Sequence, residues 1–107
     1  MSSTLKKYLN VLEFISKIKD KRVREGVLKQ YANFDDFYQA LYEIAINLVN
    51  KNFPLSNEIK KKFKPHKQKI LSLTRNNKSA RVRRKKVIQT GGFLPLLIPL
   101  LLSLLSQ

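Results

Sequence analysis

Lysine and arginine side chains are the residues of this chain whose number and spacing could do chemistry, and that chemistry is the neutralisation of anions. Residues 57–107 hold 13 basic side chains against a single acid, Glu58. A field of this strength attracts polyanions, and nucleic acid or the acidic face of a membrane are the natural candidates. The predicted nucleic-acid-binding residues are Lys60, Lys61, Lys62, Lys64, Lys67, Lys69, Lys78, Arg81, Arg83, Arg84, Lys85 and Lys86.

The other reactive residue types are too sparse for catalysis. The chain has no cysteine and one histidine, His66, so neither a disulfide nor a zinc or iron–sulfur site is expected. Asp35 and Asp36 are adjacent, but adjacent acids at the start of a helix point about 100° apart and interact with the helix dipole. No nucleophile, base and orienting residue can be assembled, and no glycine-rich phosphate loop is present. We expect no enzyme activity, no metal and no cofactor.

The cluster "KSARVRRKK", residues 78–86, is compatible with a solvated tail, a nuclear localisation signal, an anionic-lipid patch or a nucleic-acid arm. Nucleic acid is favoured because the lysine-rich segment before it extends the same field. Duplex DNA carries about one negative charge per 1.7 Å of axis, so these cations can contact many phosphates without reading bases. Stacking aromatics and side chains suited to base edges are scarce here. Binding is therefore expected to be sequence-independent and strongly salt-dependent.

The elements that position these cations are predicted to be helices, because apolar residues recur at intervals of three and four and no strand-like alternation appears. Ser3, Asp20 and Asn33 are the expected N-caps of three helices in the first half of the chain. Their apolar stripes are Leu5, Leu9, Leu12, Ile15 and Ile18; then Val23, Val27, Leu28 and Tyr31; then Phe37, Leu41, Ile44, Ala45 and Leu48.

The lysine-rich segment is predicted to be a fourth helix. Ser56 is its expected cap, Pro65 should kink or restart it, and Asn76-Asn77 should end it. Its packing stripe is Ile59, Phe63, His66, Ile70 and Leu73. The expected fold is all-α: a small bundle of three to four helices over residues 1–76, a mobile basic arm over 77–90, and a Gly-Gly joint with an apolar tail over 91–107.

The apolar tail from 93 to 105 is too short for a simple membrane anchor. As a helix it would reach roughly 20 Å, against the ~30 Å hydrocarbon core of a bilayer. A helix there should begin near Pro95 and bend before Pro99. The segment could dock on the bundle, enter a membrane interface or plug a partner protein. The membrane- or partner-contacting residues would be Phe93, Leu94, Leu96, Leu97, Ile98, Leu100 and Leu101.

Two stretches carry a family resemblance. "GGFLPLLIPL", after basic residues, resembles the precursor of the adenovirus core protein mu (protein X) over about residues 81–102. The layout of "LNVLEF", "RVREGVLK", "NLVNKNFPLSNEIKKKFKPHKQKILSL" and "RRKKVIQTGGFLP" resembles the mu/X-like proteins of adenovirus-related Maverick/Polinton transposons and adintoviruses. The second resemblance covers nearly the whole chain.

The resemblance implies a capsid-associated or virion-core protein that compacts viral double-stranded DNA in the virion and host nucleus. It also implies capsid proteins as partners and a viral cysteine protease that cuts after Gly-Gly, here between Gly92 and Phe93 beside Gly91. Gln89 departs from that protease's pattern, because Met, Leu or Ile is usual at its position; Ile88 comes one residue earlier. The alternatives from the residues are a membrane-associated protein, with the basic arm on anionic lipid, and a protein-interaction scaffold.

Overall fold

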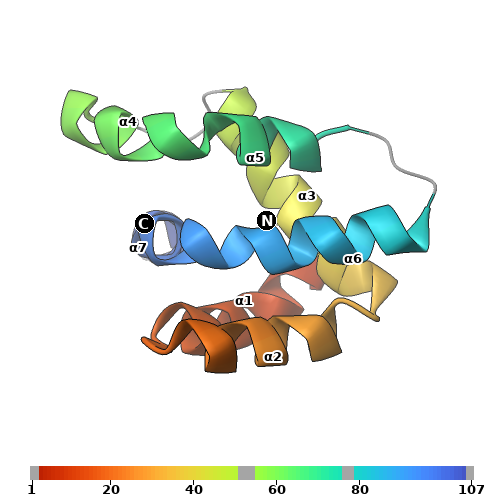
Figure 1. Cartoon of the computed structure of the whole chain (residues 1–107). Helices are drawn as coiled ribbons and strands as arrows, with labels where there is room; N and C mark the ends of the chain where they lie inside the picture. Colours follow the sequence, from red (N-terminus) through yellow and green to blue (C-terminus); the bar gives the residue numbers. More distant parts are fainter. Residues whose placement is uncertain (1–2, 51–54, 76–78, 106–107) are drawn as a thin grey trace.

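The structure is a computed structural model that describes residues 3–50, 55–75 and 79–105. These residues form an all-α bundle, without a strand among them, and this confirms the expected fold class (Figure 1). Its α-helices and 3-10 turns are α1 Ser3–Ser16, α2 Lys21–Tyr31, α3 Asp35–Val49, α4 Asn57–Phe63, η1 Lys64–His66, α5 Lys67–Leu73, α6 Ala80–Gln89, η2 Thr90–Gly92 and α7 Leu94–Leu105.

Of the four predicted helix caps, two are confirmed. Ser3 is the first residue of α1 and not the cap before it, and the residues that precede it lie outside the described part of the chain. Asn33 is also not a cap. Asp20 Oδ1 accepts hydrogen bonds from the backbone N–H groups of Arg22 (2.8 Å) and Val23 (3.3 Å), and Ser56 Oγ accepts one from Ile59 (3.2 Å). Asn33 is not the cap of α3, because Phe34 holds that position without a side-chain hydrogen bond. The acidic first turn of α3 compensates for the missing cap, since carboxylates there favour the positive end of the helix dipole.

The lysine-rich segment is one rod-like unit, α4–η1–α5, which we call the lysine rod (residues 57–73). Pro65 lies in the 3-10 turn η1, at the interruption that the sequence predicted. A proline has no backbone N–H, so the interruption of the helix at residue 65 leaves no donor of that residue unpaired. α5 ends at Leu73, and the expected stop at Asn76-Asn77 lies outside the described residues.

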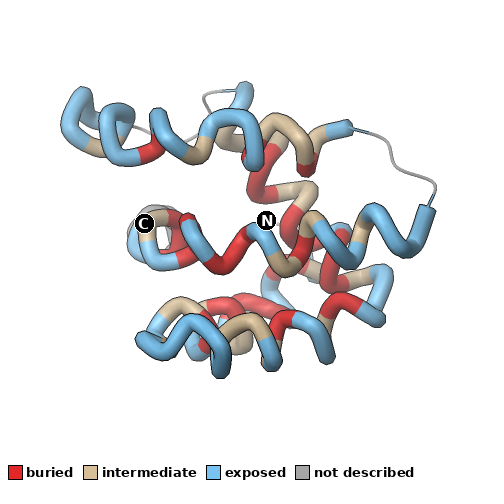
Figure 2. Tube along the Cα trace, viewed as in Figure 1, coloured by how far each residue is buried: buried red, intermediate tan, exposed pale blue. Residues whose placement is uncertain are grey.

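The apolar stripes predicted for α1 and α3 are confirmed as core except at their last residues: Ile18 lies beyond the end of α1, and Ile18 and Leu48 are half-buried. Leu12, Ile15 and Phe37 are fully buried, and the buried positions lie toward the middle of the molecule in Figure 2. The stripe predicted for α2 is less buried, and its first residue, Val23, has a side chain that is 54% exposed. It lies in the first turn of α2, whereas Leu28, further along that helix, is the residue that α2 buries completely.

The residues expected to form a mobile arm include helix α6, which is packed into the bundle. α6 contacts α2, α3 and α5, and Val87 is fully buried. Hydrophobic periodicity could not reveal this helix, because Val87 is the only residue that α6 buries completely. The proposed division between a bundle ending at residue 76 and an arm beginning at 77 therefore does not describe how α6 is placed.

The apolar C-terminal segment forms α7 and docks on the bundle, the first of the alternatives left open by the sequence. α7 contacts α1, and Phe93, Leu94, Leu97 and Ile98 are only 1%, 0%, 2% and 3% exposed. The helix begins one residue before Pro95 and continues through Pro99. These four side chains belong to the same apolar cluster as the stripes of α1 and α3.

Truncation after Gly92 is expected to unfold the protein. It removes four buried apolar side chains, each worth about 1.5–3 kcal/mol of burial free energy, from a fold whose total stability is typically about 5–15 kcal/mol. Thermal unfolding followed by circular dichroism should show no cooperative transition. Pro95→Ala, at an exposed position of the same segment, is the control and should keep the transition. Equal melting of the truncated chain and this control would contradict the burial of these side chains.

Stability should also fall at acidic pH through Asp36. Its carboxylate accepts hydrogen bonds from the Tyr8 hydroxyl and from Lys7 Nζ (2.9 Å), and these bonds lower the pKa of Asp36. A lowered pKa means stabilisation that is present above the ordinary aspartate pKa, about 3.9, and is lost as pH falls through the folded value. Melting temperature should decline below about pH 4, and Asp36→Asn should flatten that decline. Tyr8→Phe keeps the ring packing and should flatten it in part; an unchanged slope in both variants would contradict the assignment.

Candidate nucleic-acid interface

Three cationic elements lie next to one another in the fold. α6 contacts α2 and α5, and Figure 1 shows α6 between α2 and the lysine rod. We call α2, α6 and the lysine rod together the cationic layer. Many of their residues are coloured as exposed in Figure 2. Cations from three separate segments of the sequence are thereby brought onto adjacent helices.

Most of the predicted phosphate-binding side chains are exposed in this layer. All six lysines of the rod are exposed, and so are three cations of α6. Lys78 lies outside the described residues. The exposed members of the predicted set are Lys60, Lys61, Lys62, Lys64, Lys67, Lys69, Arg81, Arg84 and Lys85.

The remaining two predicted cations are engaged within the fold. Arg83 Nη2 lies 3.3 Å from Asp35 Oδ1 on α3, and only 28% of the Arg83 side chain is exposed. Lys86 Nζ donates a 2.6 Å hydrogen bond to the backbone carbonyl of Ser72 on α5. Burial lowers the pKa of Lys86, and the positive charge of Arg75 lowers it further. Arg83 and Lys86 therefore hold α6 in place.

The C-terminal end of α5 is the junction between the rod and its neighbours. The carbonyl of Ser72 accepts from Lys86, and the next carbonyl, of Leu73, accepts a 3.3 Å hydrogen bond from the Tyr38 hydroxyl of α3. Carbonyls in the last turn of a helix have no partner within it, and a cation there also favours the helix dipole. The two bonds fix α5 against α6 and α3, although α5 and α6 carry like charge.

Sequence reasoning missed the contribution of α2. Lys21, Arg22 and Lys29 are exposed on this helix, beside α6. Over residues 1–56 as a whole, 9 basic side chains stand against 6 acidic ones, and this near balance hides the charge of α2. Counting by helix would have found the signal, because α2 carries four basic residues and one acid while α3 carries three acids and no base.

Few acidic residues belong to the helices of the cationic layer. Within the layer the helices contain two acids, Glu25 on α2 and Glu58 on α4. α3 holds Asp35, Asp36 and Glu43 and packs against α5 and α6. The layer therefore keeps most of its positive charge unneutralised.

The Gly-Gly joint is a packed turn. Gly91 is buried in η2, and a Cβ there would lie 3.1 Å from both Arg24 Nε and Leu28 Cδ1 of α2. Gly92 is exposed, and its Cβ would meet only His66 Cε1, at an ordinary 3.8 Å. Gly91 is therefore a glycine that allows close approach of α2.

The predicted cleavage residues Gly91, Gly92 and Phe93 are folded in a way that a protease cannot use directly. The first two form the 3-10 turn, Phe93 is buried, and α7 follows at once. A protease binds an extended strand of substrate, so η2 and the start of α7 would have to unfold first. His66, half-buried, packs its ring 5.9 Å from that of Phe93 and has a structural role here.

The predicted membrane- or partner-contacting residues are mostly inside the fold. Leu96 is half-buried beside the four buried side chains of this segment, and the side chains of Leu100 and Leu101 lie outside the description. Over the described part of the chain, each helix is too short or too polar to cross a bilayer. Among the same residues no cluster of histidine, cysteine or acidic side chains could hold a metal ion. Comparisons with protein families, with curated proteins and with solved structures gave no match.

Alanine substitutions at the two glycines should have different effects. Gly91→Ala requires Arg24 and Leu28 to shift, and overpacking of this kind costs about 1–3 kcal/mol. Gly92→Ala meets no close atom and should be neutral or stabilising by up to about 1 kcal/mol, as alanine is in helical backbone. Urea unfolding measures both free energies. Equal effects at the two positions would rule out the close contact at Gly91.

Proposed function

We propose that this protein is a non-enzymatic core protein of a virus or virus-like transposon that binds and condenses double-stranded DNA through phosphate contacts. The observation that supports it best is the cationic layer, in which three neighbouring helices expose lysines and arginines with few acids among them. Phosphate contacts supply sequence-independent affinity, and each contact releases condensed counterions from the DNA.

The width of the cationic layer suits contact with more than one phosphate row. Packed helices lie about 8–10 Å apart, so α2 and the lysine rod, with α6 between them, are separated by about two such spacings. That separation exceeds the ~12 Å width of the major groove of DNA. A duplex lying on the layer would present both strands that border a groove to its cations.

The setting of this activity follows from the family resemblance rather than from the fold. The resemblance favours a role in packaging a viral genome, with processing after Gly92 by a maturation protease. The burial of Phe93 and Leu94 argues that such processing acts on a chain whose C-terminal helix has left the core. The same burial weighs against the alternative of a membrane-active tail, because an inserting helix would have to expose these side chains.

The DNA-binding proposal is tested by charge removal at the cationic layer. Three substitutions are tested: Arg84→Gln, Lys85→Gln and Arg22→Gln. Each should weaken DNA binding, and for a given variant the loss of affinity should be the same for duplexes of unrelated sequence. Each should also reduce the slope of log affinity against log salt by about one, since one phosphate contact is lost. Fluorescence anisotropy at several salt concentrations measures both quantities. Arg22→Gln tests α2, which the sequence alone did not identify.

Lys6→Gln is the matched control for these variants. Lys6 is exposed on α1, outside the cationic layer, and its loss changes the net charge by the same amount. It should leave the slope almost unchanged. Absence of any salt-sensitive binding by the folded wild-type protein, or a Lys6→Gln effect as large as that of Arg84→Gln, would refute the proposed interface.

A further inference from the structure

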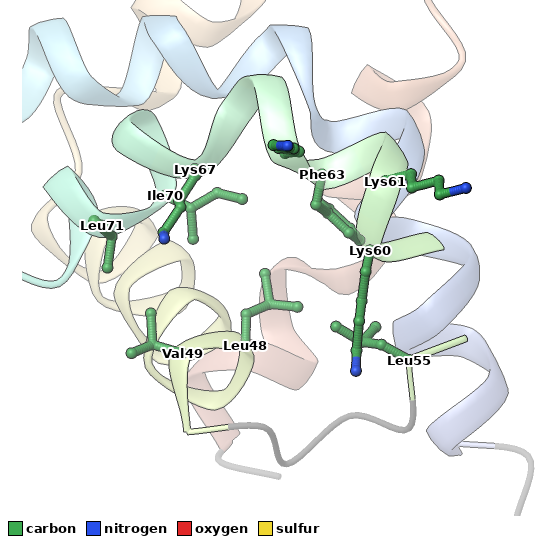
Figure 3. Close-up of a pocket in the computed structure, with 10 residues that line it drawn as sticks. Leu48, Val49, Leu55, Lys60, Lys61, Phe63, Lys67, Ile70 and Leu71 are labelled. Carbon is green, nitrogen blue, oxygen red and sulfur yellow. The ribbon is translucent and has the colours of Figure 1, made fainter. Parts of the chain in front are cut away.

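An open groove of about 510 Å³ lies between the C-terminal end of α3 and the lysine rod (Figure 3). Its walls are apolar and come from both elements and from the residue before α4. Val49 is 42% exposed, and Leu48, Leu55 and Leu71 are half-buried, so this apolar surface is accessible. The apolar lining residues are Leu48, Val49, Leu55, Phe63, Ile70 and Leu71.

Among the described residues, the charged side chains that line the groove all come from one edge, the lysine rod. These are Lys60, Lys61, Lys64 and Lys67. On the opposite edge, the described lining residues are the apolar Leu48, Val49 and Leu55. In Figure 3, the Lys60 side chain extends from the rod toward Leu55 and the Lys67 side chain extends toward the end of α3, whereas Lys61 points away from the groove.

Three of these lysines form a row along the groove. Lys60, Lys64 and Lys67 follow one another at intervals of four and three residues, and all three line the groove, so they lie on the groove side of the rod along about 10 Å of its length. An amphipathic helix bound in a groove presents apolar anchors at the same intervals. Acidic residues along one flank of such a helix would meet this row, whereas the single head group of a lipid would meet one end of it.

We infer that this groove binds an acidic amphipathic helix of a partner protein. The apolar face of that helix packs on the floor made by Val49, Leu71 and their neighbours, and its acidic flank pairs with the lysine row. This inference goes beyond DNA binding and does not depend on it. Lys62 and Lys69 do not line the groove, and α6 is a separate element. DNA on those cations and a partner in the groove can therefore be bound together.

The experiment uses a fluorescently labelled peptide of about 16 residues, long enough to form a marginal helix. Leucines at intervals of three and four form its apolar face, and glutamates follow one flank. We expect saturable binding to the full chain, measured by anisotropy, and no saturable binding of a scrambled peptide of equal composition. Leu71→Ser and Val49→Ser should each weaken the peptide about tenfold.

A charge exchange tests the lysine row. Lys64→Glu should weaken the glutamate peptide about tenfold and should bind a peptide with lysines on that flank better than wild type does. Lys62→Glu is the matched control on the same rod, away from the groove, and should change either affinity by no more than about twofold. Circular dichroism checks that each variant is folded.

Several results would overturn the inference. They are equal binding of the scrambled peptide, equal effects of Lys64→Glu and Lys62→Glu, and an absence of saturable peptide binding by folded wild-type protein. Binding of anionic-lipid vesicles that Leu71→Ser abolishes, without peptide binding, would make the groove a lipid site and refute a helical partner. Leu71→Ser should keep wild-type DNA affinity and Arg84→Gln should keep wild-type peptide affinity, so failure of this inference and failure of DNA binding give different results.

Discussion

Burial of the C-terminal apolar segment against α1 is the interaction on which the assembly depends. The lysine rod and α6 carry like charge, and at low ionic strength their mutual repulsion opposes a compact state. Hydrophobic burial is the term large enough to offset it, since it scales with area and is insensitive to charge sign. Phe93, Leu94, Leu97 and Ile98 are four of the 21 buried apolar residues in the described part of the chain. The apolar segment therefore makes it possible for cationic helices to stand side by side.

Polar contacts then set how the cationic helices are arranged. Lys86 joins α6 to the carbonyl of Ser72, Tyr38 joins α3 to the carbonyl of Leu73, and Arg83 pairs with Asp35. Each contact joins two elements that burial alone would leave free to slide. Arg83 and Lys86 are used for this purpose, so these two cations are not available to bind an anion at the surface. The cations of the chain consequently fall into two groups. Buried or paired cations position helices, and exposed cations face solvent.

Local signals predicted much of the fold because they act within one helical turn. The stripes of α1 and α3, the caps at Asp20 and Ser56 and the break at Pro65 are of this kind. α6 was missed because its single fully buried residue, Val87, gives no period. The buried face of α7 was hidden for the opposite reason, since nearly every residue there is apolar and no stripe stands out. The close contact at Gly91 and the groove beside Leu71 are tertiary, because they join helices that are distant in sequence.

The pairing of α1 with α7 also has a consequence for synthesis. A ribosome makes α1 first, and the residues that complete its burial follow some eighty positions later, after all the lysines and arginines of the chain have been made. Until α7 leaves the ribosome, the nascent chain is a polycation with an unfinished core beside ribosomal RNA. Contacts between such distant segments carry a loop-closure cost and slow folding. Because of this order of translation, α7 packs on α1 only after the lysines and arginines between them have been exposed to ribosomal RNA.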